Sequence, residues 1–131
     1  MGSTFRRPSR LSTIAGVLGA LLMLLSAPVH SLSGWPELQS ALTSSNASAD
    51  LVLALRIGWH FAGAAMAGFG LILLHLFLSR ARGTDGTVVP AWMIGGLYVL
   101  FGVTALVVSG FDPFFLVFIV PGGLVLVGVL V

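Results

Sequence analysis

The chain contains no cysteine and no lysine, and few of its side chains carry a charge. Charged residues make up 8% of the sequence, about a third of their share in typical soluble proteins. Without cysteine the protein has no disulfide bond, no thiolate metal ligand and no thiol nucleophile. All six basic residues are arginines, and they form no basic face of the kind that binds nucleic acid. These absences exclude an ordinary soluble domain and a nucleic-acid-binding protein.

Apolar residues dominate the sequence and are gathered into four long runs. They make up 57% of the chain, whose mean hydropathy is +1.09. A helix of about 20 residues crosses the roughly 30 Å of bilayer hydrocarbon. We therefore expect transmembrane helices at about residues 11–29, 51–79, 90–109 and 113–131. The sequence predicts an all-α membrane protein, a four-transmembrane-helix bundle in which residues 1–131 form a single integral membrane domain.

Residues 30–50 form the one extended polar segment, which we expect to be an outer loop. Within it, Gly34-Trp35-Pro36-Glu37 is typical of a helix start, with proline and an acid in the first turn. The sequence predicts a short interfacial helix here, anchored by Trp35. One alternative stays open: the first run also resembles a signal peptide, cleaved so as to remove residues 1–31.

The arginines predict the orientation of the chain in the membrane. Five of the six fall on one side if the chain crosses at every apolar run: Arg6, Arg7, Arg10, Arg80 and Arg82. The positive-inside rule then places both termini in the cytoplasm and residues 30–50 outside. We expect an integral protein of a bacterial inner membrane.

The second run carries the most distinctive polar side chains. Arg56 and His60 lie four residues apart and therefore share one helix face, above a strip of small residues that favours close helix packing. An arginine at this depth needs an acidic partner or access to the headgroups. The expected result is a structural polar cluster on the outer side of the membrane, formed by Arg56, His60, Asp112, Glu37 and His30.

The histidines of the second run, His60 and His75, are candidate cofactor ligands. Haem or chlorin can be held by a single imidazole, and His30 could face His60 across one haem. Arg56 would then meet a propionate or, if the cofactor were a quinone, a carbonyl oxygen. A metal site made of His30, His60 and Asp112 has no local spacing motif to support it, so we predict none. The sequence itself requires no cofactor.

The sequence gives little support for catalysis. None of the four acids falls inside an apolar run, and no nucleophile elbow or glycine-rich phosphate loop is present. We therefore identify no catalytic residue and do not expect an enzyme.

The scarcity of polar chemistry favours a role in assembly. Several apolar runs have helix faces of small residues, which allow close helix packing. The last run reaches Val131 with no basic or aromatic residue after it to anchor it at the membrane surface. Both features predict an accessory or scaffold subunit of a larger membrane complex. Its partners would be the lipid bilayer and other membrane subunits or further copies of the chain. Two alternatives remain: a haem-, pigment- or quinone-binding redox or photosynthetic subunit that uses His60, and a small oligomeric transporter or channel.

Overall fold

The computed structural model describes residues 8–84 and 86–131, and every regular element in that part of the chain is a helix. Within residues 8–84 and 86–131, four helices are long and apolar enough to cross a membrane. The predicted all-α fold is thereby confirmed. In chain order the elements are α1 (Arg10–Val29), a π-helical turn (His30–Gly34), α2 (Trp35–Ser44), α3 (Ala49–Ala81), α4 (Val89–Val108), a 3-10 turn (Pro113–Phe115) and α5 (Leu116–Leu130).

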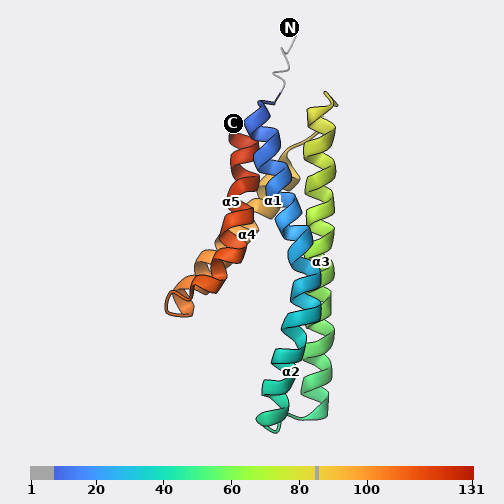
Figure 1. Cartoon of the computed structure of the whole chain (residues 1–131), viewed down its shortest axis with the longest axis vertical. Helices are drawn as coiled ribbons and strands as arrows, with labels where there is room; N and C mark the ends of the chain where they lie inside the picture. Colours follow the sequence, from blue (N-terminus) through green and yellow to red (C-terminus); the bar gives the residue numbers. More distant parts are fainter. Residues whose placement is uncertain (1–7, 85) are drawn as a thin grey trace.

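The first helix is longer than its apolar run. α1, the π-helical turn and α2 form one uninterrupted helix of 35 residues (Figure 1). The π turn begins two residues after Pro28, which has no N–H to donate within the helix and whose ring disturbs the preceding turn. The predicted helix at Trp35 exists, but it extends α1 and packs beside the start of α3 instead of standing apart in a loop.

The described part of the chain consists of two helical hairpins. The long hairpin (residues 10–81) pairs the first helix with α3, and the short hairpin (residues 89–130) pairs α4 with α5. α1 packs against both α3 and α5, whereas the consecutive helices α3 and α4 scarcely touch. The hairpins pack together at the end that holds both termini and diverge toward the other end (Figure 1). The four helices therefore form a wedge and do not run side by side as in a regular bundle.

The core lies at the closed end of the wedge. It contains Phe77 and Met23, the largest of its fully buried side chains. The other buried members of this cluster come from all four long helices: Ala20, Leu73, Ala91, Ile94, Tyr98 and Val125. Glycines allow the helices to approach there, since a Cβ atom on Gly70 would lie 2.8 Å from the backbone nitrogen of Leu24.

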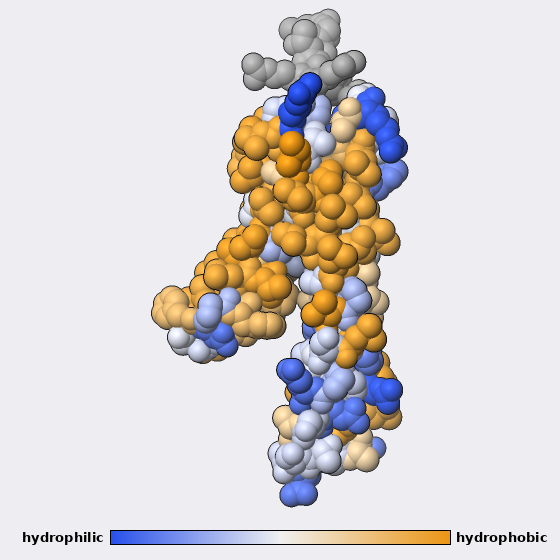
Figure 2. Space-filling view, viewed as in Figure 1, coloured by the Kyte–Doolittle hydropathy of each residue, from blue (hydrophilic) through white to orange (hydrophobic). Residues whose placement is uncertain are grey.

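Polar surface is gathered at the ends of the long hairpin. Figure 2 shows hydrophilic residues at both ends of this hairpin and a hydrophobic surface between them. The end near the N-terminus holds Arg10 at the start of α1 and Arg80 and Arg82 at the end of α3, three of the five arginines predicted to share one side. The other two, Arg6 and Arg7, lie outside the described residues, as does Asp85.

Candidate functional site

A cleft of about 600 Å³ opens where the two hairpins diverge. Figure 2 shows the opening between the hydrophobic short hairpin and the long hairpin. We call this the wedge cleft. The long hairpin supplies nine of its lining residues: Ser26, Val29, His30, Ser33, Gly34, Glu37, Leu38, Trp59 and Met66. The short hairpin supplies the remaining five: Phe101, Phe114, Phe115, Val117 and Phe118.

The polar groups of the cleft lie on one wall and follow a single helix face. Ser26, His30, Ser33 and Glu37 line the cleft at positions i, i+4, i+7 and i+11 of the first helix. This spacing places side chains in a row along a helix. The row, here named the polar stripe, runs roughly 16 Å along the helix axis, from the narrow part of the wedge toward its mouth.

His30 is fixed in place by Trp59 of α3. The two rings stack with their centroids 4.3 Å apart and their planes 9° apart. The indole Nε1 of Trp59 donates a hydrogen bond to the backbone carbonyl of His30 at 2.8 Å. The imidazole Nε2 of His30 lies 3.2 Å from the backbone carbonyl of Trp59. A carbonyl oxygen only accepts hydrogen bonds, so Nε2 of His30 carries the hydrogen, and its Nδ1 is not used by this pair.

The opposite wall is mainly aromatic, and none of its described residues has a polar side chain. Phe101 and Phe118 meet edge to face, with ring centroids 4.9 Å apart. Phe114 and Phe115 make a similar contact at 5.5 Å. Such edge-to-face pairs are a favourable arrangement for aromatic rings. The cleft therefore presents an apolar surface on one side and a row of polar groups on the other.

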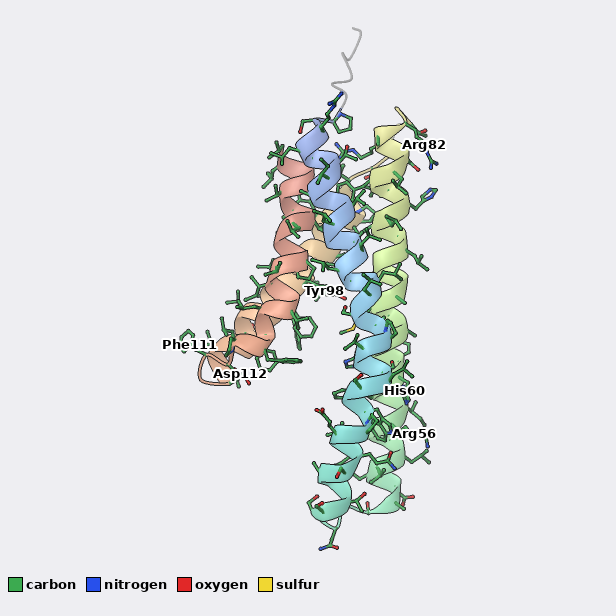
Figure 3. All side chains as sticks on the ribbon, viewed as in Figure 1. Arg56, His60, Arg82, Tyr98, Phe111 and Asp112 are labelled. Carbon is green, nitrogen blue, oxygen red and sulfur yellow. The ribbon has the colours of Figure 1, made fainter. Side chains whose placement is uncertain are left out.

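Tyr98 lies where the hairpins begin to part (Figure 3). Its ring packs between Phe69 of α3 and Phe118 of α5, at centroid distances of 6.4 and 5.9 Å. The tyrosine is 6% exposed, and its hydroxyl has no hydrogen-bond partner among the described residues. A buried hydroxyl without a partner is costly, and the ring that carries this one contacts Phe118 of the aromatic wall.

The structure separates the members of the predicted polar cluster. His30 and Glu37 both line the wedge cleft. Arg56 is exposed, and His60 is half-buried beside the ring of Trp35, 5.9 Å away. Asp112 lies at the tip of the short hairpin, apart from Arg56 and His60 (Figure 3), because the hairpins diverge. There its carboxylate accepts a hydrogen bond from the backbone N–H of Phe114 at 2.9 Å.

The candidate cofactor ligands of α3 also lie outside the cleft. Arg56, His60 and His75 are absent from its lining, and His75 is exposed. Within residues 8–84 and 86–131, no three side chains of histidine, aspartate or glutamate gather as a metal site would require. The arrangement of His30, His60 and Asp112 that could have formed such a site is therefore not found there.

Sequence reasoning missed most of the cleft. The spacing of Ser26, His30, Ser33 and Glu37 was available as a signal, but it becomes a helix face only if the helix continues past Pro28. Trp59 and the phenylalanines carried no signal, because aromatic residues in apolar runs are most often packing or lipid-facing residues.

Comparison with protein-family models, with curated proteins and with solved structures finds no match to this chain. The function must therefore be inferred from the geometry of the cleft.

Proposed function

We propose that this protein is an integral membrane protein that binds an amphipathic small molecule in the wedge cleft. The observation that supports it is the asymmetry of the cleft, in which the polar stripe faces the aromatic wall. Ligand sites for small molecules are typically apolar cavities of 300–1,000 Å³ with a few placed polar groups, and this cleft has that size and composition.

The helix lengths suggest where the cleft would lie in a bilayer. α3 has 33 residues and is roughly 50 Å long, which exceeds the hydrocarbon thickness of about 30 Å. With Arg80 and Arg82 at the cytoplasmic surface, the far end of the long hairpin would project beyond the outer surface. The polar stripe would then run from within the hydrocarbon toward the headgroups. In this position an amphiphile could enter from the lipid with its polar group toward the outer surface.

A second candidate function is the role of an accessory subunit in a larger membrane complex. One specific observation favours it. Apolar side chains at the projecting end of α3 are exposed, with Leu53 at 57% and Ile57 at 64%. The tip of the short hairpin, marked by Phe111 and Asp112, stops short of this region along the long axis (Figure 3). Apolar surface outside the hydrocarbon is typical of a protein interface.

The test compares wild type with a pair of matched variants. Val117 lines the cleft, whereas Val120 lies one turn further along the same helix and does not; they are 42% and 49% exposed. Val117→Trp fills the cleft, and Val120→Trp adds the same bulk to an exposed position of α5 outside the cleft. The three proteins are taken from native membranes into polymer-bounded lipid discs, and the bound molecules are identified by mass spectrometry.

The expected result is one small molecule that co-purifies with wild type and Val120→Trp and is lost in Val117→Trp. If the same bound molecules were found with all three proteins, in the same amounts, the proposal would be contradicted. A protein partner that co-purifies with all three would support the second candidate. If the variant Leu53→Ser no longer co-purified with this partner protein, the partner would bind at the projecting end of α3.

A further inference from the structure

We infer that the ligand of the wedge cleft is a lipophilic amine, bound as its protonated cation with the ammonium group at the mouth beside Glu37. This inference rests on the proposed function and specifies the chemical class of the ligand. Three features of the cleft carry it: the sign of its charge, the hydrogen-bonding capacity of the polar stripe and the chemistry of the opposite wall.

The charge of the cleft is negative. Among the residues that the structure describes, Glu37 is the only charged one in the lining of the cleft, and none of the lining residues is an arginine. Among the described residues, Glu37 makes no ion pair. A carboxylate at the edge of an apolar cleft attracts a cation, and low-dielectric walls strengthen that attraction relative to open water.

The polar stripe presents hydrogen-bond acceptors more than donors. The hydroxyl of Ser26 donates to the backbone carbonyl of Met23 at 2.8 Å, which leaves only its lone pairs free. The Nε2 hydrogen of His30 points to the carbonyl of Trp59, which leaves Nδ1 as an acceptor in the neutral ring. The carboxylate of Glu37 only accepts. A ligand with N–H donors matches this wall, whereas a carbonyl or an anionic headgroup would find only the hydroxyl of Ser33 to donate to it.

The aromatic wall suits the same ligand. The faces of aromatic rings carry partial negative charge and attract ammonium groups within about 6 Å. Phe114 and Phe115 lie at the hairpin tip, on the side of the cleft opposite the polar stripe. The apolar part of the amine would lie deeper, against Met66, Phe101 and Phe118. The roughly 16 Å of the polar stripe corresponds to a tail of about a dozen carbon atoms.

The experiment measures equilibrium binding to the purified full chain in discs of phosphatidylcholine. The probes are dodecylamine, the neutral N-acetyl derivative of dodecylamine and dodecanoic acid. The variants are Glu37→Gln, which removes the charge, and Asp50→Asn, which removes an exposed acid of α3 outside the cleft. Val117→Trp reports whether binding occurs in the cleft. Binding to empty discs is subtracted for every probe.

We expect wild type to bind dodecylamine about tenfold more tightly than the neutral derivative at low salt, with the difference declining as salt is raised. Glu37→Gln should abolish that preference, and Asp50→Asn should retain it. Equal binding of all three probes by wild type, lost in Val117→Trp, would overturn the amine inference and leave the proposed function standing. Binding of no probe, together with unchanged co-purified molecules in Val117→Trp, would overturn both.

Discussion

Gly128 of α5 lies against the backbone of Gly16 in α1, and this contact forms part of the closed end of the wedge. A Cβ atom on Gly128 would lie 2.8 Å from both the Cα and the backbone nitrogen of Gly16. Beside this contact the hydroxyl of Ser12 donates a buried hydrogen bond of 2.6 Å to the carbonyl of Gly128. Helices that touch so closely at one end diverge at the other if their axes cross at an angle. The glycine contact therefore helps to create the cleft.

This contact predicts that Gly128→Ala is destabilising. The new methyl group would meet backbone atoms that cannot rotate away, and overpacking of this kind typically costs about 1–3 kcal/mol. Gly123→Ala is the matched control, because a Cβ atom there meets nothing within 4 Å. In thermal unfolding followed by circular dichroism, Gly128→Ala should melt at a lower temperature, and Gly123→Ala should melt at or above the wild-type temperature. If the two variants had the same melting temperature, the close contact at Gly128 would be contradicted.

The stacked pair of His30 and Trp59 predicts the effect of Trp59→Phe. Phenylalanine preserves an aromatic ring but has no N–H to donate to the His30 carbonyl, and the loss of one such bond costs about 1 kcal/mol. Trp92, which is 44% exposed, provides the control variant Trp92→Phe. Trp59→Phe should lower the unfolding temperature and reduce binding in the cleft, because Trp59 lines the cleft and the smaller ring no longer holds the backbone of His30 by a hydrogen bond. If both tryptophan variants behaved like wild type, the pair would have no structural role.

The short hairpin turns through two successive residues with positive φ, Gly110 at 75° and Phe111 at 69°. A bulky residue rarely adopts this conformation, which costs roughly 1–2 kcal/mol, whereas asparagine tolerates it. Phe111→Asn should therefore raise the unfolding temperature. Phe111→Ala removes the ring but retains a Cβ atom in the strained conformation, so it separates the backbone effect from the loss of the side chain. If Phe111→Asn raised the unfolding temperature no more than Phe111→Ala does, the backbone strain would not have been relieved by asparagine.

The helices were predictable from the sequence because each depends on local features. The long apolar runs and the helix start at Trp35 are both recognised from neighbouring residues, within one or two helical turns. The continuity of the first helix was not predictable in this way. Pro28 and the serines after it favour a break, but an unpaired backbone group is costly near lipid, so the helix continues through a π turn.

The wedge cleft could not be predicted, because it depends on contacts between residues distant in the sequence. The hairpins pack together where Gly16 and Gly19 of α1 meet α5, more than 100 residues later in the chain. Only two members of the predicted polar cluster, His30 and Glu37, lie in the cleft. They were grouped with Asp112 on the assumption that all outer ends of the helices meet. The divergence of the hairpins removes Asp112 from that group.

The bend of α5 gives the last prediction. α5 changes direction along its length (Figure 1), and Pro121 lies within the helix. A proline there leaves the carbonyl four residues earlier without its helical partner, and kinks of this origin exceed about 20°. Pro121→Ala restores the missing N–H and should straighten α5. Because the distal half of α5 inclines away from the long hairpin, straightening would move the tip toward it and narrow the cleft.

Spin labels can measure this movement directly, since a chain without cysteine is labelled only where cysteines are introduced. Ser40→Cys on α2 and Ser109→Cys beside the tip are both exposed positions. A bend of about 20° acting on an arm of about 16 Å moves the tip by roughly 5 Å. The distance between the labels should therefore shorten by about that amount in Pro121→Ala. Pro90→Ala should leave it unchanged, because Pro90 lies in the first turn of α4, where a missing N–H costs no helical hydrogen bond. An unchanged distance in Pro121→Ala would assign the divergence of the hairpins to the glycine contacts alone.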